Sequence, residues 1–290
     1  MCKKKNFWVV ILLVLGGISV YLMYALEIYP SPKSQLYASQ SIEFREKKVN
    51  EHVQCFSALQ SVSPIQQRQF KFLVWNMHKG ADSGWQAALA SFSAQRDFLL
   101  LQEVTNMPAL YALNSTQFPT ALYTSAFEYL RQQSGVALFS RFMPQQYCAG
   151  AAVEPWIQIP KVANAMRFPL ANQQSLLLVN VHLVNFELNP THYAQQLQAM
   201  MNLIARHRGP IILVGDFNAW NGWRSQVIAK LVQQYQLQEV YFEPDERLRF
   251  FGHPLDFVFV RGLKVLQATT LKTESSDHNP LLLEVGLDVK

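Results

Sequence analysis

The 290-residue chain lacks the loops and nucleophiles on which many common enzymes depend. It contains no P-loop and no G-x-G-x-x-G turn, which argues against nucleoside-triphosphate and dinucleotide chemistry. It also contains no strand-turn-helix elbow that would expose a serine or cysteine nucleophile. Covalent catalysis therefore has no candidate nucleophile in the sequence.

Charge is also scarce in this chain. Charged residues make up 16% of it and hydrophobic residues 50%, so it can bury a large core. The formal net charge is +5, but Lys3, Lys4 and Lys5 precede an apolar run and Glu27 follows it. Without these four residues the charge is +3. That value gives no strong electrostatic footprint for nucleic acid, so charge does not select the substrate.

The three cysteines are too few for a disulfide scaffold and match no metal-binding spacing. A single bridge between Cys55 and Cys148 stays open if the domain lies in an oxidising compartment. Free thiols are the commoner state for two cysteines so far apart in sequence.

Residues 7–26 contain no charged side chain and are long enough, as a helix, to cross a hydrocarbon core of about 30 Å. We predict a transmembrane anchor here. Residues 1–6 would form a basic cytoplasmic tail, and the rest of the chain would lie outside the cytoplasm, in the periplasm or beyond it. The alternative is a signal peptide, whose cleavage would leave a secreted domain.

The remaining chain divides near residue 70. Residues 27–69 are rich in Pro, Ser and Gln, and we predict a stalk or linker with a short helix around residues 43–48. Residues 70–290 are predicted to form the catalytic domain. Its apolar runs of four to six residues are typical of strands covered on both faces, at 70–75, 98–101, 135–139, 176–181, 211–214, 257–260 and 281–285.

Helical patterns lie between these runs, at residues 85–95 and 223–235 and in a third segment that begins at Asn189-Pro190. Strands covered on both faces, with helices between them, predict layered sheets that helices cover from outside.

Polar side chains gather where the apolar runs begin or end. They are Asn76, Glu103, His182, Asp216, Asn218, Asp256, Asp277 and His278. Each alone has an ordinary explanation, such as a helix cap, a solvated carboxylate or a core histidine. Their joint occurrence at strand ends indicates one polar site at the rim of the sheets.

These residue types suit metal-assisted hydrolysis of a phosphate ester. A hard divalent cation such as Mg²⁺ takes oxygen ligands and binds through one or two carboxylates, a role that fits Glu103 and then Asp277. A histidine held by a carboxylate can act near neutral pH, and Asp256 is a candidate partner for His278.

Seven blocks in this chain resemble, in order, those of the endonuclease/exonuclease/phosphatase superfamily, which includes deoxyribonuclease I. The blocks are Val74-Trp75-Asn76-Met77-His78-Lys79-Gly80, Leu101-Gln102-Glu103, Ser134-Gly135-Val136-Ala137-Leu138-Phe139-Ser140-Arg141, Val181-His182-Leu183, Gly215-Asp216-Phe217-Asn218, Leu255-Asp256-Phe257-Val258 and Ser276-Asp277-His278-Asn279-Pro280. They cover about residues 70 to 287. The domain is also similar to uncharacterised bacterial members of this superfamily.

The resemblance implies an α/β fold, a four-layer α/β/β/α sandwich of two packed mixed sheets, with the site at one end. It implies that Glu103 is the main Mg²⁺ ligand, with Mn²⁺ as a substitute, and that Asn76 and Asp277 assist. Asp216 and Asn218 would position water and phosphate. His278, oriented by Asp256, would contact the scissile phosphate, and His182 would act as a general acid or phosphate ligand.

One position departs from the pattern of some repair nucleases, which carry Asp two residues after the first motif's Asn, near the metal. Here that position is His78, which would contact phosphate or cap its loop. We therefore expect a membrane-anchored phosphoesterase and favour a nuclease on the breadth of the family alone. The alternatives are a sphingomyelinase-like lipid head-group phosphodiesterase and an inositol or small-molecule phosphatase. A catalytically silent binding module is the alternative of a different class. No obligate protein partner is inferred.

Overall fold

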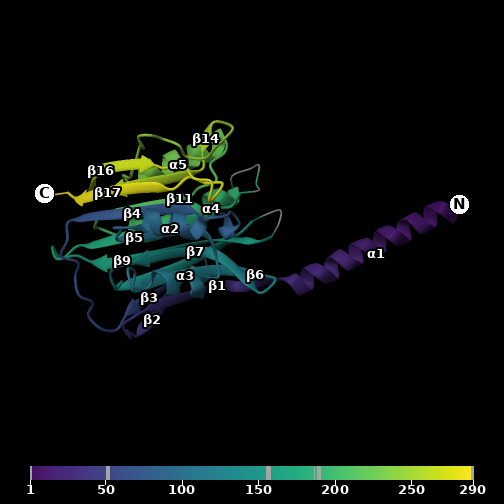
Figure 1. Ribbon diagram of the computed structural model, residues 1–290, viewed down its shortest axis with the longest axis horizontal. Helices are drawn as coiled ribbons and strands as arrows, with labels where there is room; N and C mark the ends of the chain where they lie inside the picture. The colour runs from purple at the N-terminus through teal and green to yellow at the C-terminus, as the bar shows by residue number, and fades with distance from the viewer. Residues whose placement is uncertain (1, 50–52, 155–157, 186, 188–190, 289–290) are drawn as a thin grey trace.

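Two β-sheets pack face to face and helices cover both outer surfaces, as Figure 1 shows for this computed structural model. It describes residues 2–49, 53–154, 158–185, 187 and 191–288. The seven-stranded sheet has the order β1-β6-β7-β5-β4-β17-β16 and the eight-stranded sheet the order β12-β15-β11-β10-β9-β8-β3-β2. Both are mixed, because β4 runs parallel to β5 and β10 parallel to β11.

The first sheet contains β1 (Leu26–Ala38), β4 (Gln69–Asn76), β5 (Phe98–Thr105), β6 (Thr120–Tyr129), β7 (Gln132–Ser140), β16 (Leu263–Thr270) and β17 (Leu281–Leu287). The second contains β2 (Phe44–Lys48), β3 (Val53–Ala58), β8 (Gln146–Val153), β9 (Pro160–Pro169), β10 (Ser175–His182), β11 (Ile211–Asp216), β12 (Gln238–Glu239) and β15 (Asp256–Arg261). The helices are α1 (Cys2–Ala25), α2 (Trp85–Ser93), α3 (Met107–Asn114), α4 (Thr191–Ala205) and α5 (Gly222–Gln234), with a 3₁₀ turn η1 (His78–Gly80) and a hairpin of β13 (Arg249–Phe250) and β14 (His253–Pro254).

Three large apolar clusters, and a fourth of three buried residues, lie between the four layers. In β10, Leu176 and Leu178 face the other sheet, whereas Leu177 and Val179 face the outer helices. Helices α4 and α5 cover the eight-stranded sheet and contribute Leu197 and similar side chains to the outer cluster. Helices α2 and α3 cover the seven-stranded sheet in the same way. Strands with two apolar faces appear in the sequence as continuous apolar runs. The packed sheets with helices on both outer surfaces confirm the predicted four-layer sandwich.

All seven predicted strands are present, and α2 and α5 occupy two of the predicted helical segments. The third predicted helix is α4, and its predicted start at Asn189-Pro190 lies outside the described residues. Residues 27–69 differ from the prediction of a stalk, because β1 pairs with β6 and β3 pairs with β8. The helix predicted around residues 43–48 is also wrong, since β2 occupies it. Edge strands expose one side, so they need fewer apolar residues and give a weak signal.

Helix α1 leaves one end of the sandwich and extends away from it (Figure 1). Among the residues that the structure describes, no helix is both long enough and apolar enough to cross a membrane. The anchor predicted over residues 7–26 is therefore not confirmed.

A disulfide joins Cys55 of β3 to Cys148 of β8, the pairing that the sequence left open. The two residues lie opposite each other in the antiparallel ladder, 93 positions apart in sequence. The disulfide therefore links the edge strands β2 and β3 covalently to β8 within the eight-stranded sheet.

We predict that Cys55→Ser lowers the free energy of unfolding by about 2–5 kcal/mol, because the disulfide restricts the unfolded chain. Urea unfolding followed by tryptophan fluorescence without reductant measures this loss. Cys2→Ser is the matched control and should leave the unfolding midpoint unchanged. An equal midpoint in Cys55→Ser and the unmodified chain would contradict the prediction.

Candidate active site

The predicted polar residues meet at one end of the sandwich because of strand direction. The parallel pairs β4–β5 and β10–β11 end at the same edge and deliver Asn76, Glu103, His182 and Asp216 there. Strand β15 runs antiparallel to β11 and starts at this edge, so that Asp256 lies opposite Asp216. The turn before β17 brings Asp277 and His278 to the same edge, since β17 is antiparallel to β4.

Glu103 lies in a bulge of β5. The register with β7 shifts between Leu101 and Val104, and Glu103 has a φ of 52°. A bulge redirects a side chain that would otherwise follow the alternation of the strand. Here it leaves the carboxylate 18% exposed, with its Oε2 3.2 Å from Lys79 Nζ.

The Glu103 carboxyl is ionised despite its burial. Burial alone would raise its pKa. The neighbouring His182, Lys161 and Lys79 outweigh burial and lower this pKa to about 2. Glu103 is therefore ionised at neutral pH, which is the state in which a carboxylate binds a divalent cation.

Asp216 is the centre of the site. Its Oδ2 accepts a hydrogen bond from Asn76 Nδ2 at 3.1 Å and lies 3.5 Å from His182 Nε2 and 4.0 Å from His278 Nε2. Its Oδ1 accepts from the backbone N–H of Asn218 at 2.9 Å. Burial raises the pKa of Asp216 to about 6, although the neighbouring His278 opposes the shift.

Gly215 explains why Asp216 can reach this position. It has a φ of 136°, and a Cβ there would lie 2.0 Å from the carbonyl oxygen of Val181. Any side chain would separate β10 from β11 at the site, so the backbone requires glycine.

His278 and Asp256 form a buried ion pair. His278 Nδ1 lies 2.7 Å from Asp256 Oδ2, and the His278 carbonyl accepts from Trp75 Nε1 at 2.9 Å. Burial alone would lower the pKa of His278, but the charge and hydrogen bond of Asp256 outweigh it and raise this pKa to about 10. The imidazole is therefore a cation at neutral pH, held as the sequence predicted.

Lys161 was missed at the level of sequence. It stands at the start of β9, and its Nζ lies 3.0 Å from His182 Nε2. Burial, followed by the Lys161 charge, lowers the pKa of His182 well below its ordinary value. His182 is therefore neutral and accepts from Lys161. The only signal for this residue was a lysine that directly precedes the short apolar stretch Val162-Ala163.

His78 and Asp277 form the outer rim. His78 Nδ1 lies 2.8 Å from Asp82 Oδ2 and 3.8 Å from Asp277 Oδ1. The His78 backbone N–H donates to Asn76 Oδ1 at 3.1 Å. Both rim side chains are about half exposed, so they remain accessible to a ligand. All nine predicted residues are thus connected through contacts of 4.0 Å or less.

Buried Arg224 holds the loop that carries Asn218. Its guanidinium donates to the carbonyl oxygens of Asn218 and Val184 at 2.9 and 2.7 Å and also to those of Asn185 and Glu187. Asn218 in turn donates from Nδ2 to the Leu183 carbonyl at 2.9 Å. The arginine therefore fixes the positions of the loops that follow β10 and β11.

Two sets of residues offer metal ligands. Ligand atoms of Asp216, Asp256 and His278 lie within 4.8 Å of one another. A cationic imidazole has no free lone pair, however, so this set does not suit a metal while His278 is protonated. Glu103, with the amide oxygen of Asn76 and the rim carboxylate of Asp277, supplies the oxygen donors that Mg²⁺ prefers.

The chain matches the model of the Endonuclease/Exonuclease/phosphatase family over residues 73–278. It is 32% identical over 289 residues to a UPF0294 protein of Vibrio campbellii, covering 99% of both chains. It is 38% identical over 216 residues to a UPF0294 protein of Klebsiella pneumoniae, covering 74% of this chain and 82% of that protein.

The fold also resembles the crystal structure of an endonuclease/exonuclease/phosphatase from Beutenbergia cavernae. The TM-score is 0.58 at 14% identity, and the match covers 76% of this chain and 72% of the other.

The His278–Asp256 pair predicts a pH dependence of stability in the metal-free protein. The pKa of His278 in the folded protein, about 10, lies above the ordinary value of 6.5. The stabilisation by the ion pair is therefore complete below pH 6.5 and is lost as pH rises toward 10. We expect unfolding free energy to fall across this window by up to about 1.4 kcal/mol per pH unit. Asp256→Asn removes the partner and should flatten the fall in urea titrations with EDTA. An unchanged slope in this variant would refute the assignment.

Proposed function

The chain belongs to the Endonuclease/Exonuclease/phosphatase family, whose members hydrolyse phosphoester bonds, and we propose that it cleaves a phosphodiester or phosphomonoester by attack of water with a divalent cation bound. The observation that carries this proposal is that an ionised carboxylate and a protonated imidazole lie at the same end of the sandwich. Glu103 is ionised and His278 is protonated, each with its charge fixed by neighbours.

The chain's own groups supply proton transfer and charge stabilisation. Asp216, with a pKa of about 6, can orient a water molecule through Oδ2 and accept its proton near neutral pH. Asn76 and Asn218 hold that carboxylate in place. The protonated His278 presents its Nε2 toward the same carboxylate and can stabilise charge that develops on the phosphate.

The second positive group is the pair of Lys161 and His182. The Lys161 ammonium lies beside the neutral imidazole and can bind a phosphate oxygen by charge. A neutral His182 whose Nε2 accepts from Lys161 has no proton to give through that atom, so we assign it the role of positioning the Lys161 ammonium rather than that of general acid.

The metal site is proposed at Glu103, with Asn76 and Asp277 as further ligands. Mg²⁺ or Mn²⁺ bound there would neutralise charge on the phosphate oxygens. Lys79 forms an ion pair with Glu103 and keeps this buried carboxylate compensated.

The complete set of charged groups at this edge argues against the alternative that the chain is a catalytically silent binding module, because such a module does not need these groups. The sequence favoured a nuclease over a lipid or small-molecule phosphoesterase on family breadth alone. Turnover of plasmid DNA, sphingomyelin and bis-p-nitrophenyl phosphate, with Mg²⁺ and with EDTA, compares these classes directly.

Two substitutions separate metal binding from chemistry. Glu103→Gln should weaken Mg²⁺ or Mn²⁺ binding, because it removes the ionised ligand. His278→Ala should abolish turnover of bis-p-nitrophenyl phosphate with the metal still bound, because it removes only the cation beside Asp216. Calorimetric titration with Mn²⁺ and a turnover assay measure the two effects.

Gln133→Ala, a change on β7 outside the nine residues, is the control and should alter neither quantity. Equal metal affinity and equal turnover in Glu103→Gln, His278→Ala and the unmodified chain would refute the site assignment. No turnover of any phosphate ester, together with no metal binding, would refute the enzyme.

We also propose that the catalytic domain lies outside the cytoplasm, on the lysine pattern before residues 7–26. A reporter enzyme that is active only outside the cytoplasm, fused after Lys290, should be active, and a cytoplasmic reporter at the same position should not. The opposite pattern would show that the proposed orientation is wrong.

A further inference from the structure

Helix α1 joins the sandwich at the end that carries the site. The carbonyl oxygen of Ala25, its last residue, accepts from the Leu130 backbone N–H at 2.7 Å, and the hydroxyls of Tyr21 and Tyr129 lie 2.9 Å apart. Leu130 lies in the turn between β6 and β7. The end of α1 is therefore fixed against this turn.

The strand register places that turn at the site's edge of the sheet. Leu26 pairs with Tyr129 across β1 and β6, and Thr105, two residues after Glu103, pairs with Ser134 across β5 and β7. Strands β1, β6, β7 and β5 are neighbours in this order. At about 4.8 Å per strand, the start of β1 lies roughly 14 Å from the strand of Glu103 along the same edge.

Several exposed apolar side chains lie at this end of the sandwich. They share a position in turns or at strand and helix ends: Tyr129 and Leu130, Val153 at the end of β8, Trp223 at the start of α5, and Phe250 and Phe251 in the hairpin that leads into Asp256. We call these six residues the apolar rim. Phe251 is 79% exposed and Trp223 61%.

The rim meets α1 at Tyr129 and Leu130, which contact Tyr21 and Ala25. The helix exposes Leu12, Leu13, Val14 and Leu22 among other apolar side chains, and it points away from the site end (Figure 1). The apolar side chains of α1 and of the rim would both be removed from water by one apolar phase, such as the interface of a bilayer.

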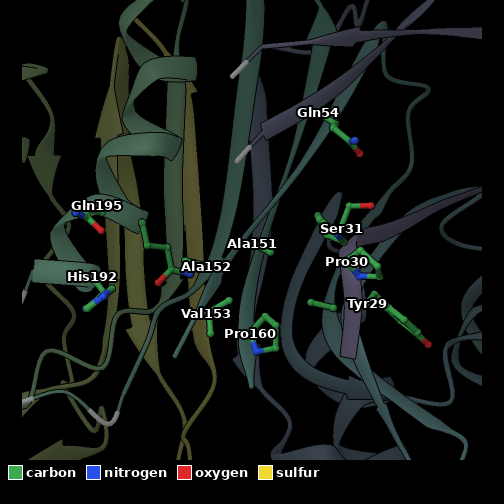
Figure 2. A pocket seen from close by; sticks show the side chains of 13 residues that line it. Tyr29, Pro30, Ser31, Gln54, Ala151, Ala152, Val153, Pro160, His192 and Gln195 are labelled. Carbon is green, nitrogen blue, oxygen red and sulfur yellow. The ribbon is translucent and has the colours of Figure 1, made fainter. Parts of the chain in front are cut away.

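A cavity of about 360 Å³ lies between the start of β1, the end of β8 and the start of α4. Figure 2 shows His192 and Gln195 of α4 on one side, Tyr29, Pro30 and Ser31 of β1 on the other, and Val153 and Pro160 between them. The cavity therefore extends from the α1 end of β1 to Pro160, which directly precedes Lys161.

We propose that the apolar rim docks on a lipid bilayer, so that the site faces the membrane and its substrate is the phosphoester of a bilayer lipid. This inference rests on the proposed function and selects the lipid class among its substrates. Lys161 and His278 would contact the phosphate of a head group at the membrane surface. The apolar rim would enter the interface around it.

Depth-dependent quenching tests the docking in the full chain. Single cysteines in a Cys2→Ser background, at Leu130→Cys and Phe251→Cys, carry an environment-sensitive fluorophore in proteoliposomes of phosphatidylethanolamine with a minor fraction of phosphatidylglycerol. Nitroxide-labelled lipids should quench both probes. Leu59→Cys is the matched control, because Leu59 is 49% exposed and follows β3 at the opposite end of the sandwich. Equal quenching at all three positions would overturn the proposal.

Turnover tests the substrate in the same proteoliposomes. The double variant Phe250→Ser/Phe251→Ser should hydrolyse bilayer phosphoesters at least about tenfold more slowly, because two side chains leave the interface. It should hydrolyse soluble bis-p-nitrophenyl phosphate at an unchanged rate, and Leu59→Ser should change neither rate.

The two proposals fail in different ways. Turnover of the soluble ester without release of phosphorylated or free head groups from the bilayer, followed by ³¹P NMR, overturns the lipid substrate and leaves the proposed function standing. No turnover of the bilayer lipid, the soluble ester or plasmid DNA, together with no metal binding, overturns the proposed function itself.

Discussion

The contact between Asn76 and Asp216 ties the two sheets together at the site, and the other site groups depend on it. Asn76 ends a central strand of the seven-stranded sheet and Asp216 ends a central strand of the eight-stranded sheet. A carboxylate buried at this junction would be costly without partners. Hydrogen bonds from Asn76 and Asn218, with two imidazoles within 4.0 Å, provide that compensation. The packing of the sheets and the chemistry of the site thus both require the hydrogen bond between Asn76 and Asp216.

Local backbone conformations adapt a regular fold to this requirement. Glu103 and Asn218 have φ values of 52° and 45°, and Gly215 allows β10 and β11 to approach where a side chain would collide. Unfavourable φ values persist only where surrounding contacts enforce them. Here Lys79 and Arg224 supply such contacts, through an ion pair with Glu103 and a hydrogen bond to the Asn218 carbonyl. Glu103 and Asn218 are thus strained residues that place polar side chains at the site.

Seven strands could be predicted from sequence, because burial on both faces leaves long apolar runs, and the site residues could be predicted because they lie directly before or after these runs. The long strands β6, β8, β9 and β16 were not predicted. In β8, Gly150 and several alanines give little β character. Strands β1 and β2 were missed because their polar residues face solvent at sheet edges. Strand β3 lies between β2 and β8, but only Val53 and Cys55 are fully buried in it. Lys161 escaped prediction because its role depends on the pairing of β9 with β10, which no local pattern specifies.

The position of α1 follows from the same topology that builds the site. Strand β1 is antiparallel to β6, so its first residue must lie where β6 ends, and the β6–β7 turn lies at the edge where β5 delivers Glu103. A chain that entered the sheet through β1 in the opposite direction would place α1 at the far end, beside Leu59. The order of the neighbouring strands β1, β6, β7 and β5 therefore places α1 at the same end of the sandwich as the site. A surface that binds α1 would face that end. Because the hairpin before Asp256 and the start of α5 reach the same end, that surface meets apolar side chains from both sheets rather than from α1 alone.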